Sequence, residues 1–555
     1  MPGIKRTRKQ VASKKKPISK TKPAPKKSAA KKSSKKPAPK INKRATKAKN
    51  KAASPEPSDS DDGKNLVERK TALSNGVMVD HKIPNPQQYV VVKYCNMVLN
   101  ANLMYSDCGH NNNKFYIIQG LKSGNTCWLW TRWGRVGVDG QVCKQACGSE
   151  AMLYNMYYKK LNQKTSKGYK EIKISYEDTK ETEKKADKLS KKKVKKNKSK
   201  LSDEVQDLMK FIFDMKQIEK SVVKVGFNVK KLPLGKLSKE TIKNGYTALK
   251  KIEKALKKKN KQELSELSSE FYTYIPHDFG FQKMSNFIID NKDKLKEKLD
   301  LVQTLGDIQI TAEIDKEVAD QDDELHELDA KYKRLNCKIE PLSKSSKEYK
   351  TLIQTLNMKV NNQQKTVFGL FGGGSNAPTM TPLEVFKISR QGESRKFKKK
   401  MGNRKLLWHG STFSNWGGIL SQGLRIAPPE APCCGYAFGK GVYFADIPQK
   451  SSGYTRHYMS DNIGLLALCD VAIGKPYHAT NCNSGLNKKT IPKGTDSTHA
   501  KGYMVPSKSY NMGGADLQLG PIDNKQSNGW LYQSEFIMYD VDQIEMKYLF
   551  KCRIG

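Results

Sequence analysis

Residues 405 to 454 have the types and spacing needed to hold a flat, polar ring attached to a sugar. A short apolar segment ends in His409, Gly410 and Ser411. These residues supply an imidazole, a bare backbone that a ligand can approach closely and a hydroxyl. A proline-stiffened loop follows, and a glycine-bounded strand then carries Tyr443. The stretch therefore predicts a pocket that offers aromatic faces together with hydrogen-bonding groups.

Four motifs of the chain resemble the donor-binding core of the poly(ADP-ribose) polymerases, in the family's order. They read Leu-Trp-His409-Gly-Ser, Gly-Leu-Arg425-Ile-Ala-Pro-Pro-Glu-Ala-Pro, Gly-Lys-Gly-Val-Tyr443-Phe-Ala-Asp and, far downstream, Ser-Glu535-Phe-Ile-Met-Tyr-Asp. The last motif matches the strand that carries the family's catalytic glutamate. Taken alone, His409 would be interpreted as a core histidine and Glu535 as a solvated charge on a strand. The four motifs together favour an enzyme.

The resemblance implies that NAD⁺ is the donor substrate. Gly410 would pair its backbone with the nicotinamide amide, assisted by the Ser451 hydroxyl, and Tyr443 and Tyr454 would enclose the nicotinamide ring. His409 would hold the ribose on the adenine side. The other donor-binding residues that the resemblance implies are Ser411, Asn415, Gly418, Arg425 and Tyr436.

Glu535, His409 and Tyr443 form the catalytic set that the resemblance implies. Breaking the bond between nicotinamide and ribose gives the sugar oxocarbenium character, and the cationic leaving group needs no strong acid. The reaction needs negative charge near the ribose in a dry site. Glu535 would accept a hydrogen bond from the ribose 2′-hydroxyl and act as general base on the incoming hydroxyl, a role typically worth about 10²–10⁴-fold. Family members with this set generally build polymers, although some close relatives mainly add one unit.

Composition indicates a nuclear or cytosolic protein with a polyanionic partner. The 555 residues carry a formal net charge of +47, which favours nucleic acid over a membrane surface. No apolar run approaches the roughly 18 residues that cross a bilayer, and no apolar signal segment stands at the N-terminus. The 11 cysteines are scattered, which is typical of free thiols.

Residues 1–80 are expected to be a disordered basic tail. Between Lys5 and Lys51 there are 21 lysines and arginines, and the first acidic residue is Glu56. Such a tail binds DNA phosphates regardless of base sequence and can serve in nuclear import. A tail that only improves solubility is the alternative.

Residues 84–175 are expected to form a small, mostly β domain that resembles the tryptophan-glycine-arginine (WGR) domain, which binds DNA ends in this family. Strand-like runs precede Trp133, and Ser149 is the N-cap candidate of a following helix. Trp133 would stack on an exposed sugar or base, while Arg135 and Arg132 would contact phosphate. The alternative places Trp133 in the core and leaves the arginines without a ligand.

We expect no metal site, because the cysteines and histidine of this domain match no pair of zinc knuckles. They are Cys108, His110, Cys143 and Cys147.

A basic linker is expected over residues 176–200, followed by an all-α domain over 201–325. Apolar residues recur at helical spacing from Val205 to Ile218 behind an N-cap candidate at Ser202.

Two phrases in the all-α region, Leu-Pro-Leu-Gly-Lys-Leu-Ser238 and Tyr-Ile-Pro-His277-Asp-Phe-Gly, resemble the family's helical regulatory domain. That domain shields the donor pocket until DNA binds. Ser238 would cap a helix, and His277 is expected to be structural. Asp307 stands at a position that faces the pocket in relatives, whereas Gln303 replaces an acid found in some of them.

Residues 326–555 would form the ADP-ribosyltransferase domain. The fold class is therefore multidomain, with a disordered basic tail, a small mostly-β WGR domain, an all-α regulatory domain and an α+β ADP-ribosyltransferase domain. Strands are predicted at Leu383–Ser389, Gly464–Cys469, Glu535–Tyr539 and Tyr548–Phe550.

The sequence thus predicts a nuclear NAD⁺ ADP-ribosyltransferase that DNA strand breaks activate and that modifies proteins, itself included, with poly(ADP-ribose) in DNA damage signalling and repair. Break binding would loosen the helical domain and admit NAD⁺. Expected partners are broken DNA, chromatin proteins such as histones as acceptors, and an accessory factor that completes the active site. The alternatives are a break-activated mono-ADP-ribosyltransferase and a non-catalytic chromatin protein that binds DNA ends.

Overall fold

The computed structural model describes residues 73–74, 77–172, 198–227, 238–319, 325–360, 378–433, 435–525 and 531–555. All of them belong to the unit formed by residues 61–555. Nearly all of the predicted tail and most of the predicted linker lie outside the described residues. Within the described ranges, no helix combines the length and the apolar character needed to cross a bilayer.

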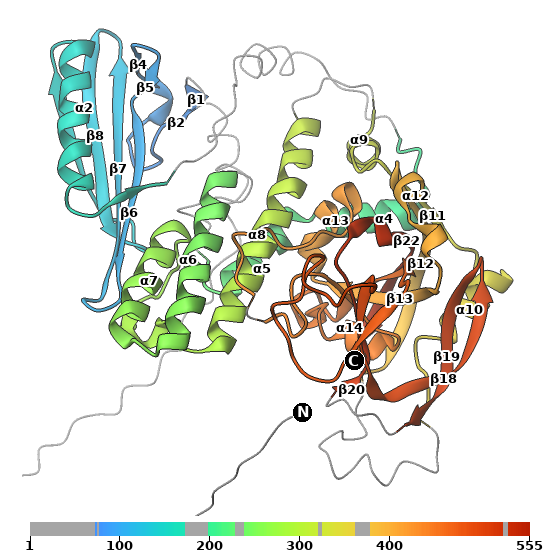
Figure 1. The fold of residues 1–555 in the computed structure, drawn as a ribbon. Helices are drawn as coiled ribbons and strands as arrows, with labels where there is room; N and C mark the ends of the chain where they lie inside the picture. Colours follow the sequence, from blue (N-terminus) through green and yellow to red (C-terminus); the bar gives the residue numbers. More distant parts are fainter. Residues whose placement is uncertain are drawn as a thin grey trace, which may run out of the picture. The chain divides into compact units, whose positions relative to one another are not determined.

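The first described domain is built on an antiparallel sheet with the strand path β10-β6-β7-β8-β9, and β3 pairs with β7. Helix α2 covers one face of this sheet (Figure 1), and the Ser149 hydroxyl accepts a hydrogen bond from the Met152 amide, which confirms the predicted N-cap. The elements are β1 (Leu73–Ser74), β2 (Val77–Met78), η1 (Pro86–Gln88), β3 (Val90–Val91), β4 (Lys93–Tyr94), β5 (Met97–Val98), β6 (Asn100–Asp107), β7 (Asn112–Ser123), β8 (Thr126–Arg135), β9 (Gln141–Cys147), α2 (Glu150–Thr165) and β10 (Lys170–Glu171).

Two details of this domain add to what the sequence indicates. The first of the strand-like runs that precede Trp133, Tyr89–Tyr94, is divided at Val92, because Val92 bonds through its backbone to Gly120 and Leu99 instead of continuing one ladder. Residues before 84 also pack onto this domain, since the side chains of Val77 and Val79 are buried in one of its apolar clusters.

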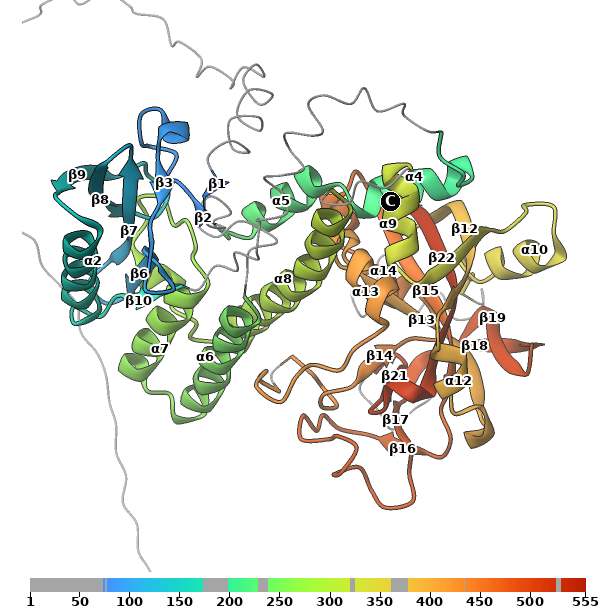
Figure 2. The same cartoon turned by 90° about the horizontal axis from the view of Figure 1, so that it is seen from above.

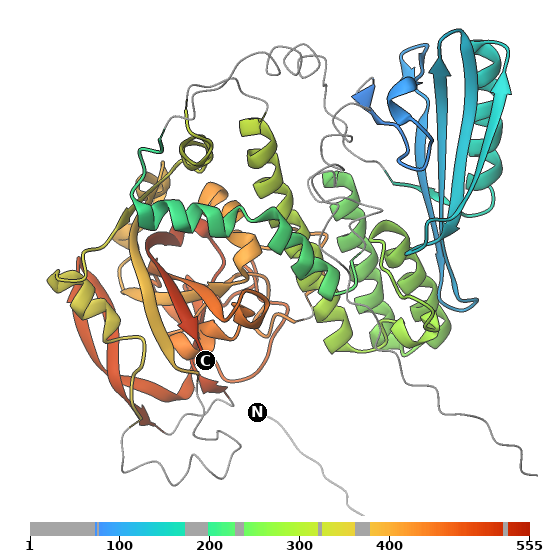
Figure 3. The same cartoon turned by 180° about the vertical axis from the view of Figure 1, so that it is seen from behind.

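The helical region consists of α4 (Asp203–Ile212), α5 (Met215–Lys224), α6 (Lys239–Lys258), α7 (Lys261–Tyr274), η2 (Met284–Phe287) and α8 (Lys292–Ala319). The expected helix from Val205 to Ile218 is split into α4 and α5 (green in Figure 3), because Asp214 caps α5 through the Gln217 amide. Ser202 makes no side-chain cap bond, whereas Ser238 accepts from the Thr241 amide as predicted.

The α+β domain contains an eight-stranded sheet of order β11-β12-β22-β15-β13-β19-β18-β20 and a four-stranded sheet of order β14-β21-β17-β16 (Figure 2). All four predicted strands are confirmed. The elements are α9 (Glu327–Arg334), β11 (Cys337–Pro341), α10 (Lys347–Ile353), β12 (Met380–Arg390), α12 (Glu393–Lys396), η4 (Lys399–Met401), β13 (Arg404–Ser411), η5 (Phe413–Asn415), α13 (Trp416–Gln422), β14 (Val442–Phe444), α14 (Pro448–Ser452), η6 (His457–Met459), β15 (Ile463–Ala472), β16 (Pro476–Ala479), β17 (Ser497–Ala500), β18 (Gly502–Met512), β19 (Ala515–Asn524), β20 (Leu531–Gln533), β21 (Glu535–Met538), η7 (Val541–Gln543) and β22 (Ile544–Ile554).

Candidate active site and nucleic-acid surface

His409 lies where the two sheets of the α+β domain meet. The preceding residue on β13, Trp408, exchanges backbone hydrogen bonds of 2.8 and 3.0 Å with Ala445, which directly follows β14. The Nδ1 atom of His409 lies 2.9 Å from the carbonyl oxygen of Tyr443. Burial lowers the pKa of His409, against the opposing effect of that carbonyl, so the imidazole is neutral at pH 7. Nδ1 therefore donates to the carbonyl, and Nε2 is left as an acceptor.

Glu535 reaches the same junction of the two sheets from the C-terminal part of the chain. Strand β21 pairs with β14 so that Phe536 lies opposite Phe444, which places Glu535 next to Ala445. One carboxylate oxygen, Oε1, lies 2.8 Å from Nζ of Lys450 on α14. The other, Oε2, is buried and has no hydrogen-bond partner in the described part of the chain. A buried oxygen without a partner is costly, and it suits a position that a substrate hydroxyl completes.

Helix α14 also fixes the turn at Gly410. The Ser451 hydroxyl donates to the Trp408 carbonyl over 3.0 Å. A Cβ atom on Gly410 would lie 2.0 Å from the Ser451 carbonyl oxygen. The glycine is therefore required by the packing of α14, in addition to any ligand. Because alternate residues of a strand direct their amides to the same edge, the backbone of Gly410 faces the edge that Trp408 uses.

The predicted aromatic residues offer ring faces and not proton-transfer groups. The Tyr443 hydroxyl donates to the Gly439 carbonyl over 2.7 Å and accepts from the Phe438 amide over 3.0 Å. The ring of Tyr436 lies 6.0 Å from that of Tyr443, centroid to centroid. Burial raises the pKa of both tyrosines, so both hydroxyls stay protonated. Tyr454 is 55% exposed.

The remaining predicted donor residues lie against helix α8. The Asn415 amide donates to the Ser411 hydroxyl over 2.9 Å. Arg425 forms an ion pair with Asp307 of α8. A Cβ atom on Gly418 would lie 3.0 Å from the Asp307 carbonyl oxygen. Burial raises the pKa of Asp307 to about 6, with Arg425 acting in the opposite direction.

Three further positions of α8 contact the α+β domain. Asp300 pairs with Arg456 at 3.3 Å. The Thr311 side chain packs on Gly417, and that of Lys296 packs on Gly435. Together with Asp307, these contacts extend along one side of the helix. The regulatory helix thus lies against Gly418 and Arg425, two of the residues predicted to bind the donor.

Two site residues were missed from the sequence. Lys450 holds Glu535, and it also donates to the Gln533 carbonyl over 3.1 Å. Asp446 is buried, burial raises its pKa to about 7, and its Oδ1 has no hydrogen-bond partner among the described residues. No local signal separates Lys450 from the other 101 of the chain's 102 lysines and arginines. In the described ranges, no three His, Cys, Asp or Glu side chains gather as a metal site requires.

Trp133 lies beside a cluster of aromatic rings and unpaired cations. Its half-buried ring stacks on Tyr116 with centroids 5.6 Å apart and planes at 13°. Nζ of Lys164 lies 4.0 Å from the Tyr116 ring centroid. Burial lowers the pKa of Lys164, and the neighbouring charges of three lysines lower it further. These are Lys160, Lys167 and Lys114. Where the structure describes the chain, none of the four lysines pairs with a carboxylate, as suits a surface for nucleic acid.

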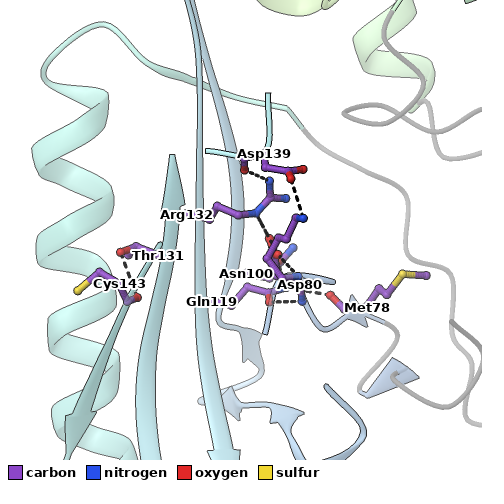
Figure 4. A network of polar contacts seen from close by, with 9 residues as sticks. Met78, Asp80, Asn100, Gln119, Thr131, Arg132, Asp139 and Cys143 are labelled. Carbon is purple, nitrogen blue, oxygen red and sulfur yellow. Dashed lines mark hydrogen bonds and ion pairs between the residues drawn. The ribbon is translucent and has the colours of Figure 1, made fainter. Parts of the chain in front are cut away.

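Arg132 does not occupy the predicted position for contacting phosphate. Its side chain is only 4% exposed, and its Nε lies 2.8 and 3.0 Å from the two oxygens of Asp80 (Figure 4). A third bond of 2.8 Å runs to the Asp139 carbonyl. Asp80 in turn accepts from the Lys82 amide, and Gln119 accepts from the amide of Asp80. Arg132 is therefore a structural residue of the domain.

This network gives a stability prediction. Asp80→Ala leaves a buried guanidinium without its carboxylate, so the free energy of unfolding is expected to fall by about 3–5 kcal/mol. Chemical denaturation followed by tryptophan fluorescence measures the change. Asp139→Ala is the control, because that side chain is 77% exposed and Arg132 uses only the Asp139 backbone. Equal losses in the two variants would contradict the assignment.

Arg135 makes contacts with a second region of the chain that the sequence did not predict. Its guanidinium donates to the carbonyls of Gly280 and Asn111, both over 3.0 Å, and to that of Gln282 over 3.4 Å. Gly280 and Gln282 belong to the loop after α7. In this structure Arg135 thus ties the sheet domain to the helical region, and its contact with phosphate stays a prediction.

The sheet domain and the helical region also share a hydrophobic core. Phe115 and Val136 of the former cluster with Phe271 and Tyr272 of α7. The Asn113 amide donates to the His277 carbonyl over 2.8 Å, and His277 is buried, as expected for a structural residue. The two regions are therefore packed together by both apolar and polar contacts.

Comparisons with known proteins agree with this arrangement. The model of the poly(ADP-ribose) polymerase catalytic domain matches residues 346–554, that of the regulatory domain matches 199–332, and that of the WGR domain matches 99–176. The domain limits inferred from the sequence stay predictions, because a family model need not span a whole domain.

Several curated relatives cover most of the chain. Poly [ADP-ribose] polymerase 2-A of Oryza sativa subsp. japonica is 39% identical over 476 residues, 81% of this chain and 69% of the relative. Poly [ADP-ribose] polymerase 2 of Homo sapiens is 35% identical over 496 residues, 83% of this chain and 81% of the relative. The chain belongs to the poly(ADP-ribose) polymerase family, the NAD⁺ ADP-ribosyltransferases, and carries the WGR, regulatory and catalytic domains in that order.

Proposed function

We propose that this protein, when bound to a DNA strand break, transfers ADP-ribose from NAD⁺ to proteins and extends the product into poly(ADP-ribose). The observation that carries the proposal is the convergence of Glu535 and His409 on one site against which helix α8 packs. Glu535 and His409 would act on the substrate, and helix α8 would restrain the enzyme until DNA binds.

The residues around β13 fit the donor. The neutral His409 has Nε2 available to accept a hydrogen bond from a ribose hydroxyl. The backbone of Gly410 suits a primary amide, which needs one acceptor and one donor. The rings of Tyr443 and Tyr454 would bound the nicotinamide, and Ser451 supports the turn through Trp408.

Glu535 would act on the ribose and on the acceptor. Its free Oε2 accepts a hydrogen bond from the 2′-hydroxyl, while Lys450 fixes the carboxylate through Oε1. The bond from ribose C1′ to nicotinamide breaks, and nicotinamide leaves with the electron pair. The acceptor oxygen bonds to C1′, and its proton passes to Glu535. A preorganised charge in a water-poor site is the main source of rate enhancement here.

Helix α8 would keep the enzyme inactive when no DNA is bound. It contacts Arg425 and Gly418, which are proposed donor residues, so NAD⁺ has to displace it or wait for it to move. DNA at the Trp133 surface would shift the helical region through Arg135 and the shared core. Because the two sites are coupled, DNA favours NAD⁺ entry and NAD⁺ favours DNA binding by the same factor.

The proposed switch is tested with one plasmid in two forms. We expect nicotinamide release to be far faster with DNA cut once than with the same closed circular DNA. The circular form is relaxed beforehand, so the two forms share their sequence and superhelical state and differ at the break. Equal rates with both forms, or with no DNA, would reject the switch.

Arg135 gives a separate prediction about the coupling between the DNA-binding surface and the helical region. Arg135→Ala is expected to reduce stimulation by broken DNA by about 5–150-fold, the usual range of a coupling free energy of 1–3 kcal/mol. Nicotinamide release across a DNA titration separates maximal stimulation from affinity. Arg135→Lys keeps the charge but loses the forked donor that holds the two loop carbonyls, those of Gly280 and Gln282. It should therefore lose stimulation by DNA to a similar extent. A lysine variant with wild-type stimulation would show that Arg135 acts through its charge on phosphate.

The cellular role follows from the same proposal. We infer that the protein works in the nucleus, in DNA damage signalling and repair, and that chromatin proteins, including histones, accept ADP-ribose. An accessory factor beside Glu535 is a further proposed partner. The products on a denaturing gel separate polymer, seen as a ladder, from the single band of a mono-ADP-ribosyltransferase.

A further inference from the structure

Phe281 is the most exposed large apolar residue in the described ranges. It has 93% of its surface accessible, whereas the next such residue, Tyr458, reaches 66%. Partly exposed apolar side chains are common on protein surfaces and need no explanation. An aromatic ring left almost wholly in water is a different case, because it gains nothing from packing within the chain.

The loop that carries Phe281 is held on both sides. The Gly280 and Gln282 carbonyls both accept from Arg135. The Gly280 amide donates to Asp278 over 2.9 Å, and the Met284 amide donates to Asn111 over 3.0 Å. Gly280 adopts a φ of +54°, which turns the chain outward at this point. The ring therefore projects from a fixed backbone, and a ligand would pay little entropy to order it.

The surroundings of Phe281 are rich in positive charge. The Arg135 guanidinium donates to the carbonyls of the residues on either side of Phe281. Lys114 lies directly opposite Arg135 in the β7–β8 register. The side chain of Lys283 is exposed two residues further on. Neither Lys114 nor Lys283 pairs with a carboxylate in the part of the chain that is described. Asp278 is the acidic group in the loop, and its Oδ1 is engaged by the Gly280 amide. A projecting ring among cations suits a ligand that has both aromatic faces and phosphates.

We propose that Phe281 is a DNA-contacting residue supplied by the regulatory domain, and that its ring stacks on a base exposed at a strand break beside Trp133. Trp133 is two residues from Arg135 on β8, so its side chain leaves the strand on the same face as that of Arg135, which holds the residues on either side of Phe281. The proposal deepens the proposed function and rests on it.

This contact would link the break directly to the regulatory helices. Phe281 lies in the segment that leads from α7 through η2 into α8. A nucleotide stacked on this ring therefore contacts the segment that leads into α8, the helix that covers the donor residues. The break would then act on the regulatory region at its surface as well as through the WGR domain.

The test uses the full chain and a duplex with one blunt end, the other end being closed by a hairpin loop that carries a fluorophore. We expect Phe281→Ala to weaken binding by about 5–100-fold in fluorescence anisotropy, as for the loss of one base–aromatic stack. Phe281→Trp should retain wild-type affinity. The salt dependence of binding should be unchanged, because no phosphate contact is removed. Tyr510→Ala, which truncates a 43% exposed ring in the catalytic domain, is the control and should have no effect.

A second readout locates the contact. With 2-aminopurine as the terminal base, the wild-type chain should quench its fluorescence and Phe281→Ala should not. Wild-type affinity and quenching in Phe281→Ala would overturn the inference while leaving the proposed function intact. Failure of the wild-type chain to prefer the blunt end over closed circular DNA would overturn both.

Discussion

Glu535→Gln is expected to lower ADP-ribose transfer by about 10²–10⁴-fold, with a far smaller effect on NAD⁺ affinity. Glutamine keeps the size of the side chain and an oxygen for Lys450, but it carries no negative charge and cannot take a proton. The loss should therefore fall on the chemical step and on chain elongation. Initial rates of nicotinamide release and product length on denaturing gels measure both, with broken DNA at saturation.

The matched control is Glu545→Gln. Glu545 is also a mostly buried glutamate of the catalytic domain, but it pairs with Lys547 on β22. It should retain wild-type rates and product lengths. Unchanged polymer length in Glu535→Gln, or an equal loss in the Glu545 variant, would contradict the role given to Glu535.

Gly417→Ala is expected to raise activity in the absence of DNA. A Cβ atom at this position would lie 2.4 Å from Oγ1 and 2.8 Å from Cγ2 of Thr311, whose side chain is fully buried against α13. Overpacking typically costs about 1–3 kcal/mol, which corresponds to about a 5–150-fold shift away from the closed arrangement. Alanine is a better helix former than glycine, so α13 itself should not suffer. Nicotinamide release without DNA measures the shift.

Thr311→Ala supplies the rescue. It removes the two nearest atoms that the new methyl group would meet and leaves only Cβ of residue 311, at 3.0 Å, so the double variant Gly417→Ala/Thr311→Ala should regain dependence on DNA. The effects of mutations at independent sites add, so this non-additivity would show that the α8–α13 contact restrains the enzyme. Gly417→Ala with wild-type basal activity, or a double variant as active as the single one, would show that α8 does not restrain the enzyme there.

Features that depend on local sequence could be predicted. Ser149 and Ser238 cap their helices by accepting hydrogen bonds from amides in the first turn of the same helix. Because cap and donor are close in the sequence, both caps could be predicted. The strands that carry His409 and Glu535 were also recognisable, and the motif order implied that they meet. The structure brings the two residues together through β14, while their chemical roles stay proposals.

Features that depend on distant partners could not be predicted. Arg132 was expected at the surface because its partner, Asp80, precedes the segment recognised as a domain. Arg135 was expected on phosphate because the carbonyls that engage it lie in a loop of another domain. Lys450 is one basic residue among many until β21 brings Glu535 to it. In each case burial and pairing are set by tertiary structure, which residue type and spacing do not encode.

The most direct test of the central claim is a structure of the full chain with broken DNA and a non-hydrolysable NAD⁺ analogue. The account predicts that Oε2 of Glu535 lies within hydrogen-bond distance, about 2.5–3.0 Å, of the 2′-hydroxyl of the nicotinamide ribose. His409 should contact the other ribose in the same complex. An analogue bound away from Glu535, or a Glu535 side chain turned away from the sugar, would contradict it.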